Sequence, residues 1–375
     1  MLDVPINHDP REKSMKPFRI SGLMVAMLAC SNSWAVPESA SVGTPAHAGA
    51  TTYAVHDLGS VQGGASHARA INGRGQAAGY AVFNVNGGMR PALFELGKLP
   101  LPIHTDGPGE ANGLNDDGEV VGYYMRGDSR QAFLWRRHEL RLLLSPIGGP
   151  SEASAINNRS EVVGWFEVAP GVRHGFYYYK GRLIDLGSWG GISSQATGIN
   201  KKGDIVGFRQ VAVNGIMVTQ GVLMLQGQKP RLIRPPKDFD NMLPNSINES
   251  GDVAGKMWSS SRRFDFETSA FATRDGQVVN LQRPGCCFGT AGVALNKKGV
   301  VVGYNFDRNG DPHENLTLWH PKQGQVGLSG LGRDQGWYQL TEGNDISNDG
   351  VIVGAGVQWP RDFFPHALML VPRRP

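Results

Sequence analysis

The chain has 375 residues, of which 51 are glycine and 23 are proline, while charged residues make up only 19%. This composition favours many short strands joined by tight turns over long helices, and no long segment places apolar residues at helical spacing. The net charge of +4 is small and no basic block occurs, which argues against a nucleic-acid partner.

The first residues resemble a targeting segment. Lys16 and Arg19 form a positive region, the short apolar run from Ile20 to Ala29 follows, and Ser33-Trp34-Ala35 offers small residues at a cleavage site. This pattern predicts a signal peptide over residues 1–35, with translation starting at Met1 or at Met15. The apolar run is too short for a membrane span, so none is expected after cleavage. The predicted location is extracellular or periplasmic.

Cysteines leave two questions open. Cys30 allows a second interpretation of the leader, in which it is the lipidated residue of a lipoprotein. Cys286 and Cys287 are adjacent, and in an oxidising compartment they could form a vicinal disulfide or remain two thiols in a turn. With so few cysteines the chain is not a disulfide scaffold.

After a flexible leader over residues 36–52, rich in Ala, Ser, Gly, Thr and Pro, one unit recurs seven times over residues 53–375. Its clearest mark is a polar four-residue turn that begins with Asn or Ser. The first positions of these turns are Asn72, Asn115, Asn157, Asn200, Asn248, Asn296 and Ser347, which lie 43, 42, 43, 48, 48 and 51 residues apart. A period of this size is typical of propeller blades.

Glycines accompany each turn. A glycine closes six of the seven turns, where it supplies a positive φ, and Ser160 replaces it in the third copy, so we expect that turn to be strained or differently shaped. Seven residues after each turn begins, a further glycine occurs in all copies: Gly79, Gly122, Gly164, Gly207, Gly255, Gly303 and Gly354. A glycine in a strand usually marks a bulge or the close approach of another backbone.

Strands can be placed around these marks. A strand with small residues on one side precedes each turn and is expected to lie near a central axis; three more strands follow in the first six copies, and the chain ends before the fourth strand of the seventh. The segment 53–59 supplies a strand at the other end. We therefore predict a seven-bladed β-propeller of four-stranded antiparallel blades, closed by residues 53–59 completing the last blade, over two smaller sandwiches.

The repeated unit resembles the HAF-repeat, or probable extracellular repeat, family of exported bacterial proteins. The likeness covers roughly residues 53–370, and its His-Ala-Phe signature is degenerate here, approached only by His174-Gly175-Phe176 and His366-Ala367. The resemblance implies export and a repeated architecture. It implies no catalytic residues.

Function is expected where the second connections of the blades gather, since these are longer and less alike than the turns. Aromatic residues near their starts form a candidate binding surface for a glycan or a protein: Tyr80, Tyr123, Trp165, Phe208, Trp258 and Tyr304. The alternative is that these rings pack between blades.

Other chemistry is weakly marked. Asp307, Asn309 and Asp311 are spaced like calcium ligands, but Pro312 and Leu318 stand where a calcium loop needs glycine and glutamate, so no cofactor is expected. No nucleophile elbow or phosphate loop occurs. The sequence favours a monomeric, non-enzymatic binding propeller. The alternative is an exported hydrolase or lyase with acidic residues at the axial mouth, for which the candidates are Asp265, Glu267, Asp307, Glu314 and Asp362.

Overall fold

The computed structural model describes residues 52–61, 63–83, 88–262, 267–282, 287–307, 314–358 and 364–373, without the side chains at positions 287, 288, 307 and 314. The expected signal peptide, the leader up to residue 51 and Cys30 therefore lie outside the described residues. So do Cys286 and the Cys287 side chain, and the Asp307, Asn309 and Asp311 side chains of the calcium-like segment.

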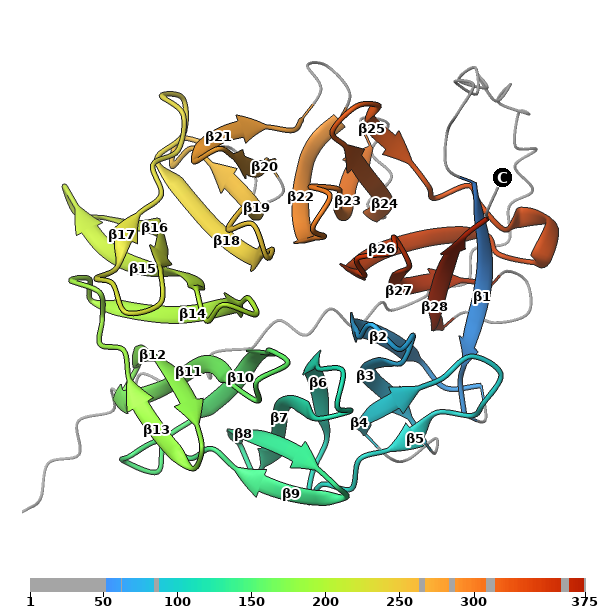
Figure 1. The fold of residues 1–375 in the computed structure, drawn as a ribbon, viewed down its shortest axis with the longest axis horizontal. Coiled ribbons are helices and arrows are strands. Elements are labelled where there is room, and N and C mark those ends of the chain that lie inside the picture. Colours follow the sequence, from blue (N-terminus) through green and yellow to red (C-terminus); the bar gives the residue numbers. More distant parts are fainter. Residues whose placement is uncertain are drawn as a thin grey trace, which may run out of the picture. The chain divides into compact units, whose positions relative to one another are not determined.

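Seven four-stranded antiparallel sheets form a ring (Figure 1), which confirms the predicted fold. Blades 1 to 3 comprise β2 (Ser66–Ile71), β3 (Ala77–Val82), β4 (Met89–Phe94), β5 (Leu101–Pro102); β6 (Gly109–Leu114), β7 (Val120–Arg126), β8 (Ser129–Arg136), β9 (Glu139–Leu142); and β10 (Ser151–Ile156), β11 (Val162–Ala169), β12 (Val172–Tyr179), β13 (Arg182–Asp185). Blades 4 and 5 comprise β14 (Ser193–Ile199), β15 (Ile205–Val213), β16 (Ile216–Met224), β17 (Arg231–Leu232); and β18 (Asn241–Ile247), β19 (Val253–Trp258), β20 (Ser269–Arg274), β21 (Gln277–Asn280). Blades 6 and 7 comprise β22 (Cys287–Leu295), β23 (Val301–Asp307), β24 (Glu314–His320), β25 (Gly324–Gly327); and β26 (Gln339–Ile346), β27 (Ile352–Val357), β28 (Pro365–Pro372), with β1 (Tyr53–Gly59) as the outermost strand.

The ring is closed by the pairing of β1 with β28, which begins with Tyr53 opposite Pro372 and ends with Gly59 opposite Ala367. In Figure 1 this strand, in blue, lies beside the last strand of the chain, in red. A one-turn 3₁₀ segment, η1 (Arg333–Gln335), precedes blade 7. Among the described residues no helix is long and apolar enough to cross a membrane.

The hydrophobic core is divided among the seven interfaces between neighbouring blades. Each interface holds its own cluster of buried residues, such as the one in which Val206 and Leu223 of blade 4 meet Met242 and Phe271 of blade 5. A blade cannot bury both faces alone, so each depends on its two neighbours and the closed ring leaves no blade with an uncovered face.

The predicted turns explain how the blades are joined at the axis. In the fourth copy, Asn200 Oδ1 accepts the backbone N–H groups of Lys202 and Asp204, each at 3.0 Å. Its Nδ2 donates to the carbonyl of Asn248, the equivalent residue of the next blade, at 3.0 Å. The same donation runs from Asn72 to Asn115 and onward around the ring as far as Ser347. Ser160 has a left-handed φ of 59°, where the glycines of the other copies have φ of 72° to 92°. A non-glycine residue in this region confirms the expected strain.

The recurring glycines of the second strands confirm the predicted close approach. In every blade the first strand carries a β-bulge, and the bulge directs a backbone carbonyl at the glycine opposite. A Cβ on Gly207 would lie 2.1 Å from the Gln195 carbonyl oxygen, and the other six glycines face equivalent carbonyls at 1.8 to 2.1 Å. No other side chain fits at these positions.

The expected long second connections are wrong for blades 2, 3 and 4. There the strands continue as extended hairpins, pairing Arg126 with Ser129, Ala169 with Val172 and Val213 with Ile216 across two-residue turns. Glycine, or Asn214 followed by glycine, supplies the positive φ that such turns need. In blades 1, 5, 6 and 7 these connections lie partly outside the described residues.

Candidate functional site

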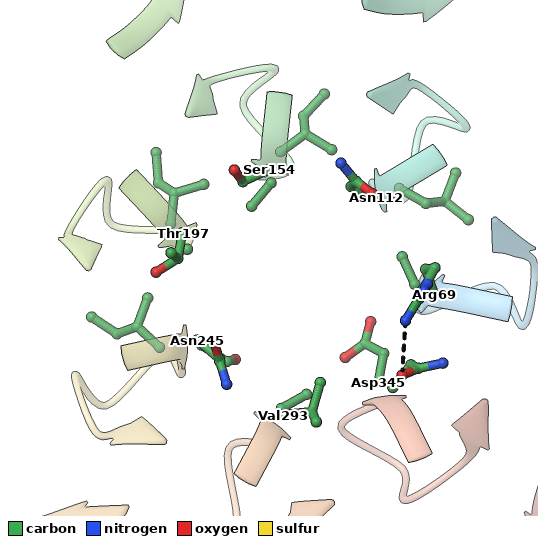
Figure 2. A pocket seen from close by; sticks show the side chains of 18 of the residues that line it. Arg69, Asn112, Ser154, Thr197, Asn245, Val293 and Asp345 are labelled. Atoms are coloured by element: carbon green, nitrogen blue, oxygen red, sulfur yellow. Dashed lines mark hydrogen bonds between the residues drawn. The ribbon is translucent and has the colours of Figure 1, made fainter. Parts of the chain in front are cut away.

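The seven bulges place one side chain each at the axis of the ring. The bulged residue is the extra residue in the pairing of the first strand with the second, so it cannot join the ladder and its side chain turns away from the sheet. The seven bulged residues are Arg69, Asn112, Ser154, Thr197, Asn245, Val293 and Asn344. All seven line one cavity of about 690 Å³ (Figure 2), which we call the axial cavity.

A second, smaller cavity of about 270 Å³ lies at the face that carries the asparagine turns, and we call that the turn face. This smaller cavity is lined by a ring of apolar residues that immediately precede the turns: Ile71, Leu114, Ile156, Ile199, Ile247, Leu295 and Ile346. Four of them, Leu114, Ile156, Ile199 and Ile247, also line the axial cavity. The axial cavity extends from this ring toward the opposite face, where the second and fourth connections of the blades emerge. We call that the loop face.

Three charged residues and one histidine gather at one side of the axial cavity. Arg69 donates through Nε to Glu110 Oε1, and its Nη1 lies 3.7 Å from Glu342 Oε2 and 3.5 Å from Asn344 Oδ1. His67 Nδ1 lies 3.6 Å from the same Glu342 oxygen, near enough for attraction but too far for a hydrogen bond. Although burial opposes it, the proximity of His67 and Arg69 lowers the pKa of Glu342 to about 2. The two glutamates likewise raise the pKa of Arg69 against the effect of burial.

Asp345 is the second unusual group in the cavity. Its equivalents in the other blades are Ala, Gly or Ser, and here its carboxylate accepts the backbone N–H groups of Ile71 at 2.9 Å and of Ile346 at 2.8 Å. The first of these bonds joins the last blade to the first. Asp345 lines both cavities and its side chain points toward the axis (Figure 2). The surrounding protein raises its pKa to about 6, because burial disfavours the charged form more than these two bonds favour it.

The aromatic residues predicted as a binding surface have unequal positions. Tyr304 lines the axial cavity. Tyr80 stacks on His67 with ring centroids 4.8 Å apart, and Tyr123 donates its hydroxyl to Glu110 Oε2 at 3.4 Å, so both lie one layer out from the axis. Trp165 and Phe208 are buried, with 5% and 9% of their surface exposed, and Trp258 is half-buried.

An arginine lies over the face of three of these aromatic rings, and the sequence does not predict these contacts. The guanidinium carbon lies 4.2 Å from the ring centroid for Arg130 over Tyr123, and 4.0 Å for Arg173 over Trp165. Arg262 covers Trp258 in the same way at 4.9 Å. A cation over the face of an aromatic ring is attracted by the ring electrons, so these rings already have one face occupied by the protein itself.

Asp265 and Asp362 and the side chains of Asp307 and Glu314, four of the five acidic residues predicted at the axial mouth, lie outside the described residues. Of that set only the Glu267 side chain is described, and it does not line the axial cavity. Among the described residues, Glu110 and Glu342 converge on Arg69. Both lie on first strands, and no local sequence pattern indicates them. Within the described ranges no group of three or more His, Cys, Asp or Glu residues is arranged to hold a metal ion.

No family model matches this chain, and no curated protein does so either. Similar solved structures are propellers. The β-propeller domain of the trilobed protease from Pyrococcus furiosus, described as having an open velcro topology, has a TM-score of 0.53 at 9% identity, covering 83% of this chain and 94% of that one. A puromycin-hydrolyzing peptidase from Mycobacterium tuberculosis has a TM-score of 0.50 at 10% identity, covering 82% of this chain and 51% of that one. TolB from Acinetobacter baumannii has a TM-score of 0.45 at 11% identity. The match covers 68% of this chain and 63% of the length of that TolB. At these identities the likeness to the trilobed protease domain and to the peptidase establishes the propeller fold alone.

Proposed function

We propose that this protein is an exported propeller of the HAF-repeat type that binds a glycan or a protein through its loop face, without catalysing a reaction. The observation that supports this most is the axial cavity. All seven blades contribute a side chain to it, its volume of about 690 Å³ is in the range of ligand sites, and most of its bulged residues are polar. A scaffold held this rigidly presents those groups in fixed positions.

The binding hypothesis is tested by screening the purified mature chain against a glycan array and measuring each hit by calorimetry. Substituting Trp258→Ala at the loop face or Tyr304→Ala at the cavity should weaken binding at least about tenfold, since an aromatic contact contributes one or more kcal/mol. Arg74→Ala at the turn face is the control and should leave the affinity unchanged. If all three variants bind as the wild type does, the ligand does not use the loop face.

A hydrolase or lyase is the second candidate, and one observation favours it: Glu110 and Glu342 both reach Arg69. A carboxylate pair of this kind needs one protonated member to act as the acid. Glu342 is not that acid, because its pKa of about 2 keeps it ionised at neutral pH. The test is release of reducing or unsaturated sugars from polysaccharides; activity that disappears in Glu110→Gln and Glu342→Gln would establish catalysis.

Export is proposed from the leader alone. Cell fractionation should place the protein in the periplasm or medium, cleaved after Ala35. Replacing Cys30 with Ser distinguishes the lipoprotein alternative, because it would release a lipid-anchored protein from the membrane fraction and would not alter one cleaved by the ordinary signal peptidase.

A further inference from the structure

The bulged asparagines have a fixed orientation. Asn112 Nδ2 donates to the carbonyl of Ala153 at 3.0 Å, and Asn245 Nδ2 donates to the carbonyl of Gly292 at 2.8 Å. In both cases the acceptor belongs to the next blade. A backbone carbonyl can only accept, so each amide must present its nitrogen to the neighbouring blade and leave its oxygen free. No donor from the described residues reaches the Oδ1 atoms of Asn112 and Asn245.

Hydrogen bonds within the protein also engage the donors of Thr197, Asn344 and Arg69, three other bulged residues. Thr197 donates its hydroxyl to the Pro244 carbonyl at 2.8 Å. Asn344 Nδ2 donates to the Ala68 carbonyl at 3.0 Å, and Arg69 is held by Glu110, Glu342 and Asn344. Ser154 also lines the cavity, and its hydroxyl can donate or accept. Because the donors named above are engaged by the protein, the other atoms that remain available to a ligand in the axial cavity are predominantly acceptors.

The charged residues that line the cavity also favour a positively charged ligand. Three carboxylates line it, Glu110, Glu342 and Asp345, against two cations, Arg69 and Lys256. Arg69 already interacts with both glutamates. Asp345 contacts only backbone N–H groups among the described residues, so no side-chain cation neutralises it. An enclosed carboxylate without a counter-ion favours the entry of a positive charge.

We propose that the axial cavity recognises a ligand that carries a primary ammonium group, such as an amino sugar, an amine or a lysine side chain. Asp345 binds the ammonium, and the Oδ1 atoms of Asn112 and Asn245, which lie across the cavity from each other, accept from further donors of the ligand (Figure 2). An ammonium offers three donors and no acceptor, which complements a lining rich in acceptors and in negative charge. This inference rests on the proposed function, since it specifies the chemistry of a ligand at the site proposed above. A neutral polyol is expected to bind less well, because its hydroxyls bring no charge.

The test compares two ligands of equal length, 1,4-diaminobutane and 1,4-butanediol, by calorimetry on the mature chain. The diamine should bind at least about tenfold more tightly, and its affinity should fall as salt is added. Asp345→Asn and Asn245→Val should each weaken the diamine about tenfold. Valine is chosen because Val293 occupies the same bulged position in blade 6. Asp117→Asn is the control, since it makes the same change of charge at an exposed site of the turn face.

The pH dependence gives an independent measurement. Because the pKa of Asp345 is raised to about 6, diamine affinity should decline as the pH falls below that value. Glu110, Glu342, Arg69 and Lys256 also line the cavity, so the decline must be absent in Asp345→Asn to be assigned to this residue. Thermal unfolding of each variant separates a loss of binding from a loss of fold.

The inference is overturned if diamine and diol bind equally or not at all, or if neither cavity variant changes diamine affinity. Its failure is distinguishable from failure of the proposed function. A ligand that depends on Trp258 but lacks an amine and ignores Asp345 would remove the inference and leave loop-face binding standing. Diamine binding that depends on Asp345, with no glycan or protein bound at the loop face, would support the inference and remove the proposed loop-face binding.

Discussion

Replacing Gly207 with alanine tests the reason for the glycine that recurs in every blade. The new Cβ would lie 2.1 Å from the Gln195 carbonyl oxygen and 2.9 Å from the Ala196 Cα, both in the backbone of the paired strand. Because ordinary contacts begin near 3.4 Å, the carbonyl would have to retreat by about 1.3 Å in a closely packed sheet.

The cost follows from that displacement. Overpacking a well-packed site costs about 1 to 3 kcal/mol, and weakening one backbone hydrogen bond of the β14–β15 pairing adds about 1 kcal/mol. We expect the free energy of unfolding to fall by about 3 kcal/mol and the melting temperature to fall by about 6 °C, at about 2 °C per kcal/mol for a domain of this size.

The assay is urea and thermal denaturation followed by circular dichroism, with Gly327→Ala as the matched control. Gly327 also lies in a strand, but a Cβ there would meet nothing within 4 Å and its φ is not positive. That change should leave stability unaltered or raise it by up to about 1 kcal/mol. A Gly207→Ala variant that unfolds together with the wild type would refute the close-approach explanation for all seven blades.

Four further substitutions test the closure of the ring and the axial charges. Ser347→Asn should raise the free energy of unfolding by about 1 kcal/mol, because its amide could donate to the Asn72 carbonyl and complete the ring of turns; an unchanged urea midpoint would contradict this. Leu58→Ala should lower the free energy of unfolding by about 2 to 5 kcal/mol, since Leu58 is 1% exposed in the cluster joining blades 7 and 1. The half-buried His56→Ala is the control, and an equally large loss of stability there would show that β1 contributes through its backbone alone. The lowered pKa of Glu342 predicts about 3 kcal/mol of stability that is present above pH 4.5 and lost as the pH falls toward 2, and Glu342→Gln should abolish that loss. Asp345 has the opposite sign: its raised pKa predicts that stability declines as the pH rises from 3.8 to about 6, and Asp345→Asn should flatten the decline. Denaturation midpoints from pH 2 to 7 measure both, and superimposable profiles for the variants and the wild type would refute both assignments.

The fold could be predicted because its signals are local and repeated. A turn such as Asn200 to Gly203 needs particular residues within four positions, and the glycine at Gly207 is required by one neighbouring backbone. Seven copies at a regular period then fix the number of blades, and the strand at residues 53–59 fixes how the ring closes. The hydrogen bond that each turn asparagine donates through Nδ2 could not be predicted, because its acceptor is a residue of the next blade.

The axial site could not be predicted because its members come from seven strands far apart in the chain. Arg69 and Asn344 are 275 residues apart, yet they lie 3.5 Å apart at the axis. A weak signal was present nonetheless: each bulged residue lies three positions before the first residue of a turn, in a strand of otherwise small residues. Reading that one position through all seven copies would have identified the lining of the cavity. The aromatic positions predict the binding surface less well, because Trp165 and Phe208 are buried.

The two recurring features of each blade are under different constraints, and this bears on where specificity resides. The glycine is the same in every copy because the bulge opposite it leaves no room for a Cβ. The bulged residue ranges from Arg69 to Val293 without loss of the bulge, so the fold does not dictate its side chain. The backbone therefore brings seven interchangeable side chains to one axis, and their identities can change the ligand without changing the scaffold. Asp345 is the exception, since it both faces the ligand and joins the last blade to the first through Ile71. At that residue a change of ligand preference and a change of stability should appear together.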